Sequence, residues 1–163
     1  MFRIGELISY RSTGVCRVED IREESLTGEK KTYYILKPIV RNSSTIYVPL
    51  DNEVLCGRMA PLMSKADAKE LLKNSHRNIV AWVEDAKARQ VAFNEIIVSG
   101  KQAQVAGVVR ALAHHKKAVA AAGRKFYASD ERLLASATKT VVGELAYVLE
   151  QGEEDIVTAL TEE

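Results

Sequence analysis

Hydrophobic and polar positions follow two different patterns along this chain. Up to about residue 60, short runs rich in β-branched and aromatic residues recur, at residues 7–10, 14–21, 32–36 and 44–48. Residues that favour turns lie between these runs, with Gly28 and Asn42 in two of the turns. This pattern predicts about five short strands that form a small, strongly bent sheet or an SH3-like barrel.

After Pro61 the apolar positions recur at helical spacing. Residues 64–67 resemble a capping box in which Asp67 stands in place of Glu, so a short helix is predicted to begin after Ser64. Gly123 is suited to an αL cap, and Ser129 is predicted to be the N-cap of a later helix. The other helices are predicted over 78–98, over 102–122, from 129 to about 148, and over 153–160.

The composition changes at the same place as the pattern. No alanine precedes Ala60, whereas twenty alanines lie from there onward, and all three prolines fall within the first 61 residues. Because alanine favours helices and β-branched and aromatic residues favour strands, we predict a two-domain α+β protein divided into residues 1–60 and 61–163. The longest stretch without Asp, Glu, Lys or Arg is residues 42–50, too short to span a bilayer, and we expect a cytoplasmic protein.

The residue types that carry catalysis or bind metals do not form a recognisable motif. Cys16 and Cys56 lack metal-ligand spacing and are predicted to be buried, reduced thiols. His114 and His115 are adjacent, so on a helix they point about 100° apart and cannot share one metal ion. No phosphate-binding glycine loop or nucleophile elbow is present. The sequence therefore predicts no enzyme activity, no metal and no cofactor.

Charge is separated along the helical part of the chain. Residues 65–125 contain twelve Lys and Arg against five Asp and Glu, whereas residues 126–163 contain two against nine. The basic clusters are Lys87 with Arg89, Arg110 with residues 114–117, and Arg124 with Lys125. Such a block is typical of a surface that binds the nucleic-acid backbone. Solvated helix faces, neutralised by the acidic tail, are the alternative interpretation.

Trp82, the only tryptophan, has two possible roles. An apolar ring on a basic helical bundle can act as a wedge against base pairs in the minor groove of DNA. Alternatively, Trp82 packs in the core, because Ala86, Phe93 and Ile97 would share its side of the predicted 78–98 helix.

Several stretches of the sequence resemble the CarD/CdnL family of bacterial transcription regulators. In the first part they are residues 2–10, 14–15, 28, 33–36 and 45–52, and in the helical part they are residues 99–100, 105–112, 131–134 and 142–146. The resemblance implies that residues 1–60 form a Tudor-like domain that binds the β subunit of RNA polymerase. It also implies that residues 61–163 form a helical domain that touches promoter DNA at the upstream edge of the transcription bubble.

The resemblance also points to contact residues. Relatives usually carry an arginine where Tyr47 stands, and Glu24 falls near a position that is basic in some relatives, so an aromatic surface is expected to replace a charge pair. The residues expected to bind polymerase are Glu24, Thr45, Ile46 and Tyr47. Arg89 and Arg132 lie where basic residues are expected, and the residues expected to contact DNA are Trp82, Lys87, Arg89, Arg110, Arg124, Lys125 and Arg132.

The functional hypothesis is a non-catalytic, monomeric regulator that bridges polymerase and promoter DNA with little sequence specificity and alters the stability of the open complex. The alternative hypothesis is a protein-interaction adaptor that binds polymerase or another partner and does not contact DNA. Salt dependence separates the two hypotheses, because binding through several cations to DNA falls steeply as salt rises.

Overall fold

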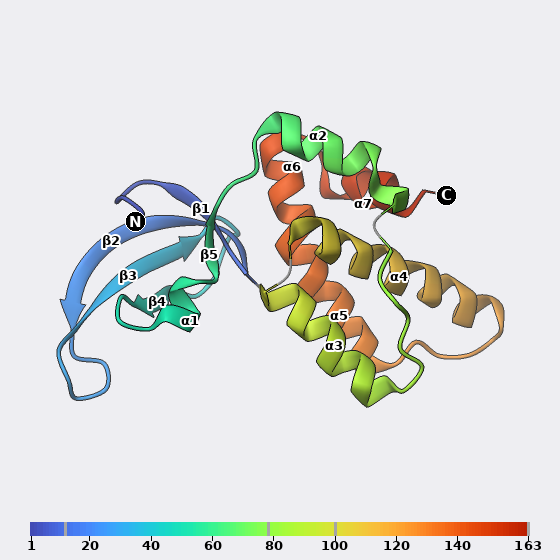
Figure 1. Ribbon diagram of the computed structural model, residues 1–163, viewed down its shortest axis with the longest axis horizontal. Coiled ribbons are helices and arrows are strands. Elements are labelled where there is room, and N and C mark those ends of the chain that lie inside the picture. The colour runs from blue at the N-terminus through green and yellow to red at the C-terminus, as the bar shows by residue number, and fades with distance from the viewer. Residues whose placement is uncertain (12, 78, 100, 163) are drawn as a thin grey trace. The chain divides into compact units, whose positions relative to one another are not determined.

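The computed structural model describes residues 1–11, 13–77, 79–99 and 101–162, and within these ranges the N-terminal unit, Met1–Leu62, is built on a five-stranded antiparallel sheet. The strand order is β4-β3-β2-β1-β5 (Figure 1). A short helix, α1 (Glu53–Cys56), precedes the last strand. The strands are β1 (Leu7–Tyr10), β2 (Gly14–Glu24), β3 (Lys31–Pro38), β4 (Ile46–Pro49) and β5 (Met59–Pro61).

One face of this sheet forms a hydrophobic core. Leu36 lies between Val18 and Ile46 in the ladder, and alternation along each strand brings the other apolar side chains to the same face. The buried members are Ile8, Tyr10, Cys16, Val18, Tyr34, Leu36, Val48 and Met59. A bulge follows Val18, since Asp20 is the next residue of β2 to pair with β3. Such a bulge bends and twists a strand, in keeping with the predicted strongly bent sheet.

Helices make up the second unit, Met63–Glu163, and pack around a core of their own. Phe93, Ile97, Leu112 and Leu145 are among its largest fully buried side chains. The helices are α2 (Lys65–Lys73), α3 (Ala86–Ser99), α4 (Gln102–Ala121), α5 (Ala128–Ala137), α6 (Gly143–Leu149) and α7 (Glu153–Thr161), with a 3-10 turn at Ser75–Arg77 and a π-helical turn at Thr138–Val142. The predicted α+β fold, a sheet followed by a helical bundle, is confirmed.

Two helix ends follow the predicted local signals. The Ser64 side chain accepts a hydrogen bond from the Asp67 backbone N–H at 3.0 Å, which satisfies one of the free donors at the start of α2. At the end of α4, Gly123 has a φ of 72°. The Arg124 N–H donates to the Val119 carbonyl at 2.8 Å, the hydrogen bond expected of a Schellman cap.

Two predicted helix starts are wrong. The start predicted at residue 78 lies outside the described residues, residues 79–85 are not helical, and α3 begins at Ala86. Asp85 stops the helix from extending further back, because its carboxylate accepts a hydrogen bond from the Ala88 N–H at 2.9 Å and caps the first turn. The helix predicted to start at Ser129 is α5, which begins at Ala128 after the extended residue Tyr127. Ser129 therefore lies inside the first turn instead of capping it.

The two thiols differ in burial, and this predicts a difference in reactivity. Burial raises the pKa of Cys16 to about 11, and this side chain is fully buried, whereas Cys56 is partly exposed. Because the thiolate is the reactive form, iodoacetamide at about pH 8 should alkylate Cys56 more than about tenfold faster than Cys16 in the native protein. Mass spectrometry of the peptides measures both rates, and urea-unfolded protein is the control. Equal rates in the native protein would contradict the burial of Cys16.

Candidate functional site

A single buried arginine connects the non-helical segment 79–85 to α3 and α5. Arg89, in the second turn of α3, is 2% exposed and forms a bidentate ion pair with the fully buried Asp130 of α5. Its Nε donates to Oδ1 of Asp130 at 2.9 Å, and its Nη2 donates to Oδ2 at 2.7 Å. The remaining nitrogen, Nη1, donates to the carbonyl oxygens of Val83 and Glu84 at 2.8 and 3.1 Å. Arg89 therefore fixes the backbone position of segment 79–85, which carries Trp82.

This geometry corrects the prediction that Arg89 contacts DNA. Hydrogen bonding to Asp130 raises the pKa of Arg89, so the guanidinium stays charged, but its charge is already balanced by a buried carboxylate. A phosphate gains little from a guanidinium that is 2% exposed and already paired with a buried carboxylate. Arg89 is thus a positioning residue within the helical unit and is removed from the set of DNA-contact candidates.

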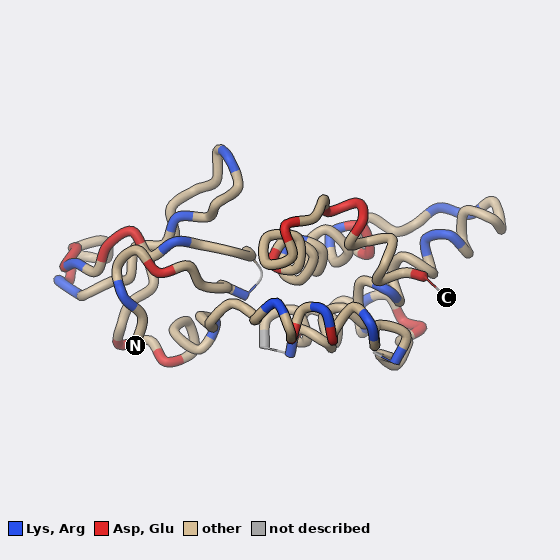
Figure 2. Tube along the Cα trace, turned by 90° about the horizontal axis from the view of Figure 1, so that it is seen from above, with Lys and Arg blue, Asp and Glu red and all other residues tan. Residues whose placement is uncertain are grey.

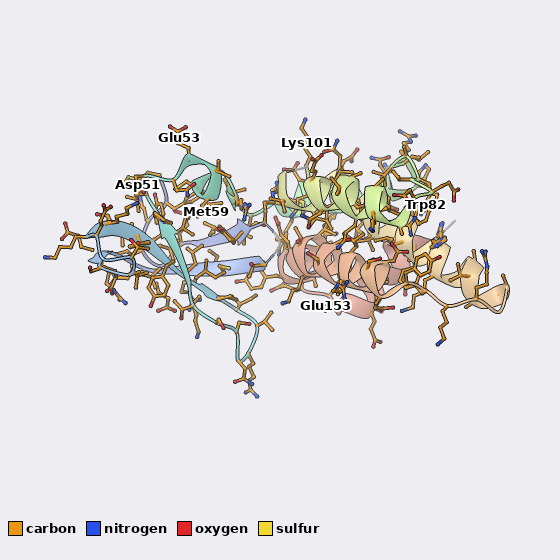
Figure 3. The ribbon with its side chains drawn as sticks, turned by 90° about the horizontal axis from the view of Figure 1, so that it is seen from below. Asp51, Glu53, Met59, Trp82, Lys101 and Glu153 are labelled. Carbon is orange, nitrogen blue, oxygen red and sulfur yellow. The ribbon has the colours of Figure 1, made fainter. Side chains whose placement is uncertain are left out.

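Trp82 lies in segment 79–85, beside the start of α3 (Figure 3), and not on a helix as predicted. Its indole is half-buried and packs against the helical core. The Arg89 guanidinium carbon lies 4.6 Å from the indole centroid, the His115 ring 4.4 Å and the Phe93 ring 5.9 Å. Trp82 is therefore in part a core residue, and a wedge role that moved the indole out would lose these three contacts.

The exposed part of Trp82 borders a cavity of about 280 Å³, here named the basic cavity. Aromatic rings from segment 79–85 and from the loop before α5 line it, together with cationic side chains from α3 and from that loop. The lining residues are Trp82, Glu84, Arg89, His115, Val119, Arg124, Lys125 and Tyr127. Lys and Arg residues occur at the carboxyl end of α4 and in the following loop (Figure 2). The cavity thus combines the two side-chain types that bind single nucleotides, aromatic and cationic.

A second hollow, named here the polar groove, runs between α3 and α5 and has a volume of about 550 Å³. Its lining residues are Gln90, Val91, Asn94, Glu95, Ser129, Arg132, Leu133 and Ser136. Both hollows are lined by residues near the starts of α3 and α5, since Arg89 and Tyr127 line the basic cavity, whereas Gln90 and Ser129 line the polar groove. Exposed Lys87 lies one helical turn before Gln90 and Val91, on the same side of α3.

The structure places Arg110 away from these two hollows. Its Nη1 donates to the carbonyl oxygen of Leu160 at 3.0 Å and also to that of Glu162, at the carboxyl end of α7. Along α4, Arg110 lies roughly 16 Å before Ala121, the last residue of the helix, and Arg124 follows beyond that end. A cation on these carbonyls balances the negative end of the helix dipole, which gives Arg110 a structural role in docking α7. Of the predicted cations, Lys87, Arg124, Lys125 and Arg132 are exposed around the cavity and groove.

Tyr127 was not predicted as a site residue, although its ring is 61% exposed and lines the basic cavity. The signal in the sequence was an aromatic pair, Phe126 and Tyr127, placed directly after Arg124 and Lys125. Asp130 was also missed. In the sequence it looks like any acidic residue near the start of a helix, and only the structure shows that it pairs with Arg89.

The residues predicted to bind polymerase do not form one compact group. Ile46 and Tyr47 lie on β4, at an edge of the sheet, with exposed Thr45 just before them. Tyr47 is 39% exposed and forms an edge-to-face contact with Tyr33 at 6.2 Å. Glu24 pairs in the ladder with Lys31, whereas Tyr47 pairs with Ile35 of the same strand. Lys31 and Ile35 lie four residues apart along β3, a distance of roughly 13 Å. Its carboxylate is bound to Arg22 at 2.7 Å.

Other kinds of site find little support in the described part of the chain. There, no three His, Cys, Asp or Glu side chains are grouped so that they could hold a metal ion. Among the same residues, no helix has both the length and the apolar character needed to cross a bilayer. The basic cavity and the polar groove form the candidate site of the helical unit, because exposed Arg124, Lys125 and Arg132 line them.

The buried ion pair predicts a large difference between two neighbouring carboxylates. Asp130→Asn leaves the Arg89 charge buried without its partner and should lower the free energy of unfolding of the helical unit by about 3–5 kcal/mol. The matched control is Glu131→Gln, which removes the exposed ion pair with Lys116 and should change it by less than about 1 kcal/mol. Urea titration followed by Trp82 fluorescence measures the unfolding of the helical unit directly. Similar effects of the two variants would contradict the buried ion pair between Arg89 and Asp130.

Comparison with known proteins identifies the family of both units. Residues 2–60 match the CarD-like/TRCF RID domain, and residues 68–161 match the CarD, C-terminal domain. The chain is 26% identical over 152 residues to a protein of Bacillus subtilis (strain 168) named "Putative transcription factor YdeB", and the aligned region covers 91% of this chain and 92% of that protein. Because the second domain match alone covers more than half of the sequence, the chain belongs to the CarD family of non-catalytic transcription regulators, which bind RNA polymerase.

Proposed function

We propose that this protein bridges the β subunit of RNA polymerase and promoter DNA in the cytoplasm, acts as a monomer, and stabilises the open complex from the upstream edge of the bubble. The observation that carries the proposal is that four exposed cations lie at or near the two hollows of the helical unit. Arg124 and Lys125 line the basic cavity, Arg132 lines the polar groove, and Lys87 lies one helical turn before two residues that line the groove. Arg89 and Arg110, in contrast, are engaged within the protein. The four exposed cations are therefore the residues proposed to contact DNA phosphates.

The sheet unit supplies the proposed anchor on polymerase. β4 is an edge strand of four residues, so one side of its backbone is open to pairing with a strand of another protein. Tyr47 adds an exposed aromatic ring at this edge, and tyrosine is enriched in protein interfaces. We propose that Thr45, Ile46 and Tyr47 form the contact and that Glu24 lies at its rim.

The helical unit supplies the DNA contact, which need not be strong. Anchoring on polymerase raises the local concentration of the helical unit at the promoter, so a few phosphate contacts suffice. Phosphate contacts position a protein on DNA without reading its sequence, so specificity should be slight. The protein shifts the equilibrium toward the open complex only by what it gains in contact with the melted state over the closed one. A gain of about 1.4 kcal/mol changes this equilibrium tenfold.

Salt dependence tests the DNA contact. Four phosphate contacts give a slope of log K against log salt of about −3.6, so affinity for duplex DNA should fall roughly a hundredfold between about 50 and 200 mM salt. Fluorescence anisotropy measures this slope. The double variant Arg124→Gln, Lys125→Gln should reduce the slope by about 2. The same double change at the exposed residues Lys69 and Lys73 of α2 is the control and should leave the slope unchanged.

Two results would contradict this part of the proposal. The first is an unaltered slope in the Arg124→Gln, Lys125→Gln variant. The second is a lack of DNA retention even when polymerase is present, which would favour the adaptor hypothesis instead.

The polymerase contact is tested by a pull-down with the isolated β subunit. Tyr47→Ala should weaken binding by about tenfold or more, because aromatic anchors account for a large share of interface energies. Val54→Ala is a matched control, since Val54 is 72% exposed on α1 of the same unit. Equal retention of the two variants would contradict the β4 contact. The lifetime of open complexes formed by purified polymerase, with and without the protein, tests the proposed function as a whole, and an unchanged lifetime and occupancy would refute it.

A further inference from the structure

Tyr127 is the most accessible aromatic ring of the basic cavity. It is 61% exposed, whereas the neighbouring Phe126 is only partly exposed and lies against Lys116 and His115. The indole of Trp82 already contacts Arg89, His115 and Phe93. A planar ligand entering this cavity therefore finds the phenol ring of Tyr127 available without rearrangement of the core.

Two cations accompany this ring. Arg124 and Lys125 are exposed and line the cavity with Tyr127, and neither forms an ion pair within the described ranges. Lys116, by comparison, is paired with Glu131 at 3.1 Å. The charges of Arg124 and Lys125 are thus available to an anionic ligand.

The size and charge of the cavity restrict the ligand. About 280 Å³ is at the lower end of the range for small-molecule sites, which leaves room for about one planar ring system. Glu84 also lines the cavity and disfavours a phosphate inside it. The phosphates of a bound nucleotide would therefore lie on the side of Arg124 and Lys125, away from the Glu84 carboxylate.

We propose that Tyr127, Arg124 and Lys125 form a binding site for one unpaired nucleotide of a DNA strand. The base stacks on the Tyr127 ring, and the two cations neutralise the flanking phosphates, which is the combination that binds single strands without sequence preference. A base in a duplex has both faces covered by its neighbours, so the site distinguishes melted from paired DNA. The inference rests on the proposed function and deepens it, because it names a contact made only in the melted state.

The test uses the purified full chain at low salt with two labelled DNAs of the same sequence, one fully duplex and one ending in an unpaired fork. Fluorescence anisotropy should show tighter binding to the fork. Tyr127→Ala should weaken fork binding at least about fivefold and leave duplex binding unchanged, whereas Tyr127→Phe, which keeps the ring, should retain it. Tyr147→Ala is the matched control, since Tyr147 is 43% exposed on α6. Unchanged Trp82 fluorescence verifies that each variant is folded.

The possible outcomes separate this inference from the proposed function. Equal binding of fork and duplex, with no effect of Tyr127→Ala, overturns the nucleotide site and leaves the phosphate contacts standing. Displacement of the fork by free AMP at a concentration similar to that of a competing oligonucleotide also overturns it, because the site would then belong to a small nucleotide. Failure of both DNAs to bind, repeated with polymerase present, refutes the DNA contact itself and the inference with it.

Discussion

The arrangement of the helical unit depends on the buried pair between Arg89 and Asp130. The two residues are 41 positions apart in the sequence, and their hydrogen bonds connect α3 to α5 while the same guanidinium binds two carbonyls of segment 79–85. This pair therefore places Trp82 and the cavity beside it. A buried ion pair is expensive to desolvate and offers little net stability, but loss of one partner leaves an uncompensated charge. The pair thus favours one arrangement of these elements over others.

Pairing within the protein distinguishes the structural cations from those that are available to a ligand. Arg89 neutralises a buried carboxylate and Arg110 binds the carbonyl end of α7, so neither contributes an open charge. Arg124 and Lys125 follow the cap of α4 and remain exposed. The net charge of residues 65–125 consequently overstates the charge that a phosphate backbone can meet. The proposed DNA contact is correspondingly modest, in keeping with the proposal that the sheet unit supplies a separate anchor.

Division of the chain into two units, each with its own core, suits the proposed mode of action. The sheet unit can keep its edge strand open for a protein partner without disturbing the helices, and the helical unit can present its cavity without a role in anchoring. Two weak contacts on one chain act together through local concentration, so neither surface has to bind tightly. The short edge strand β4 and the small basic cavity are consistent with two separate, weak contacts.

The sequence by itself determined the features that depend on near neighbours. The strand and helix patterns, the cap at Ser64 and the turn at Gly123 are decided by residues a few positions apart, and the family resemblance follows from such local motifs. Tertiary structure alone decided the burial of Arg89, the role of Arg110 and the exposure of Tyr127. The physical reason is that a charge or ring is buried or exposed according to the partner that packing brings to it. Here those partners, Asp130 and Leu160, lie 41 and 50 residues away.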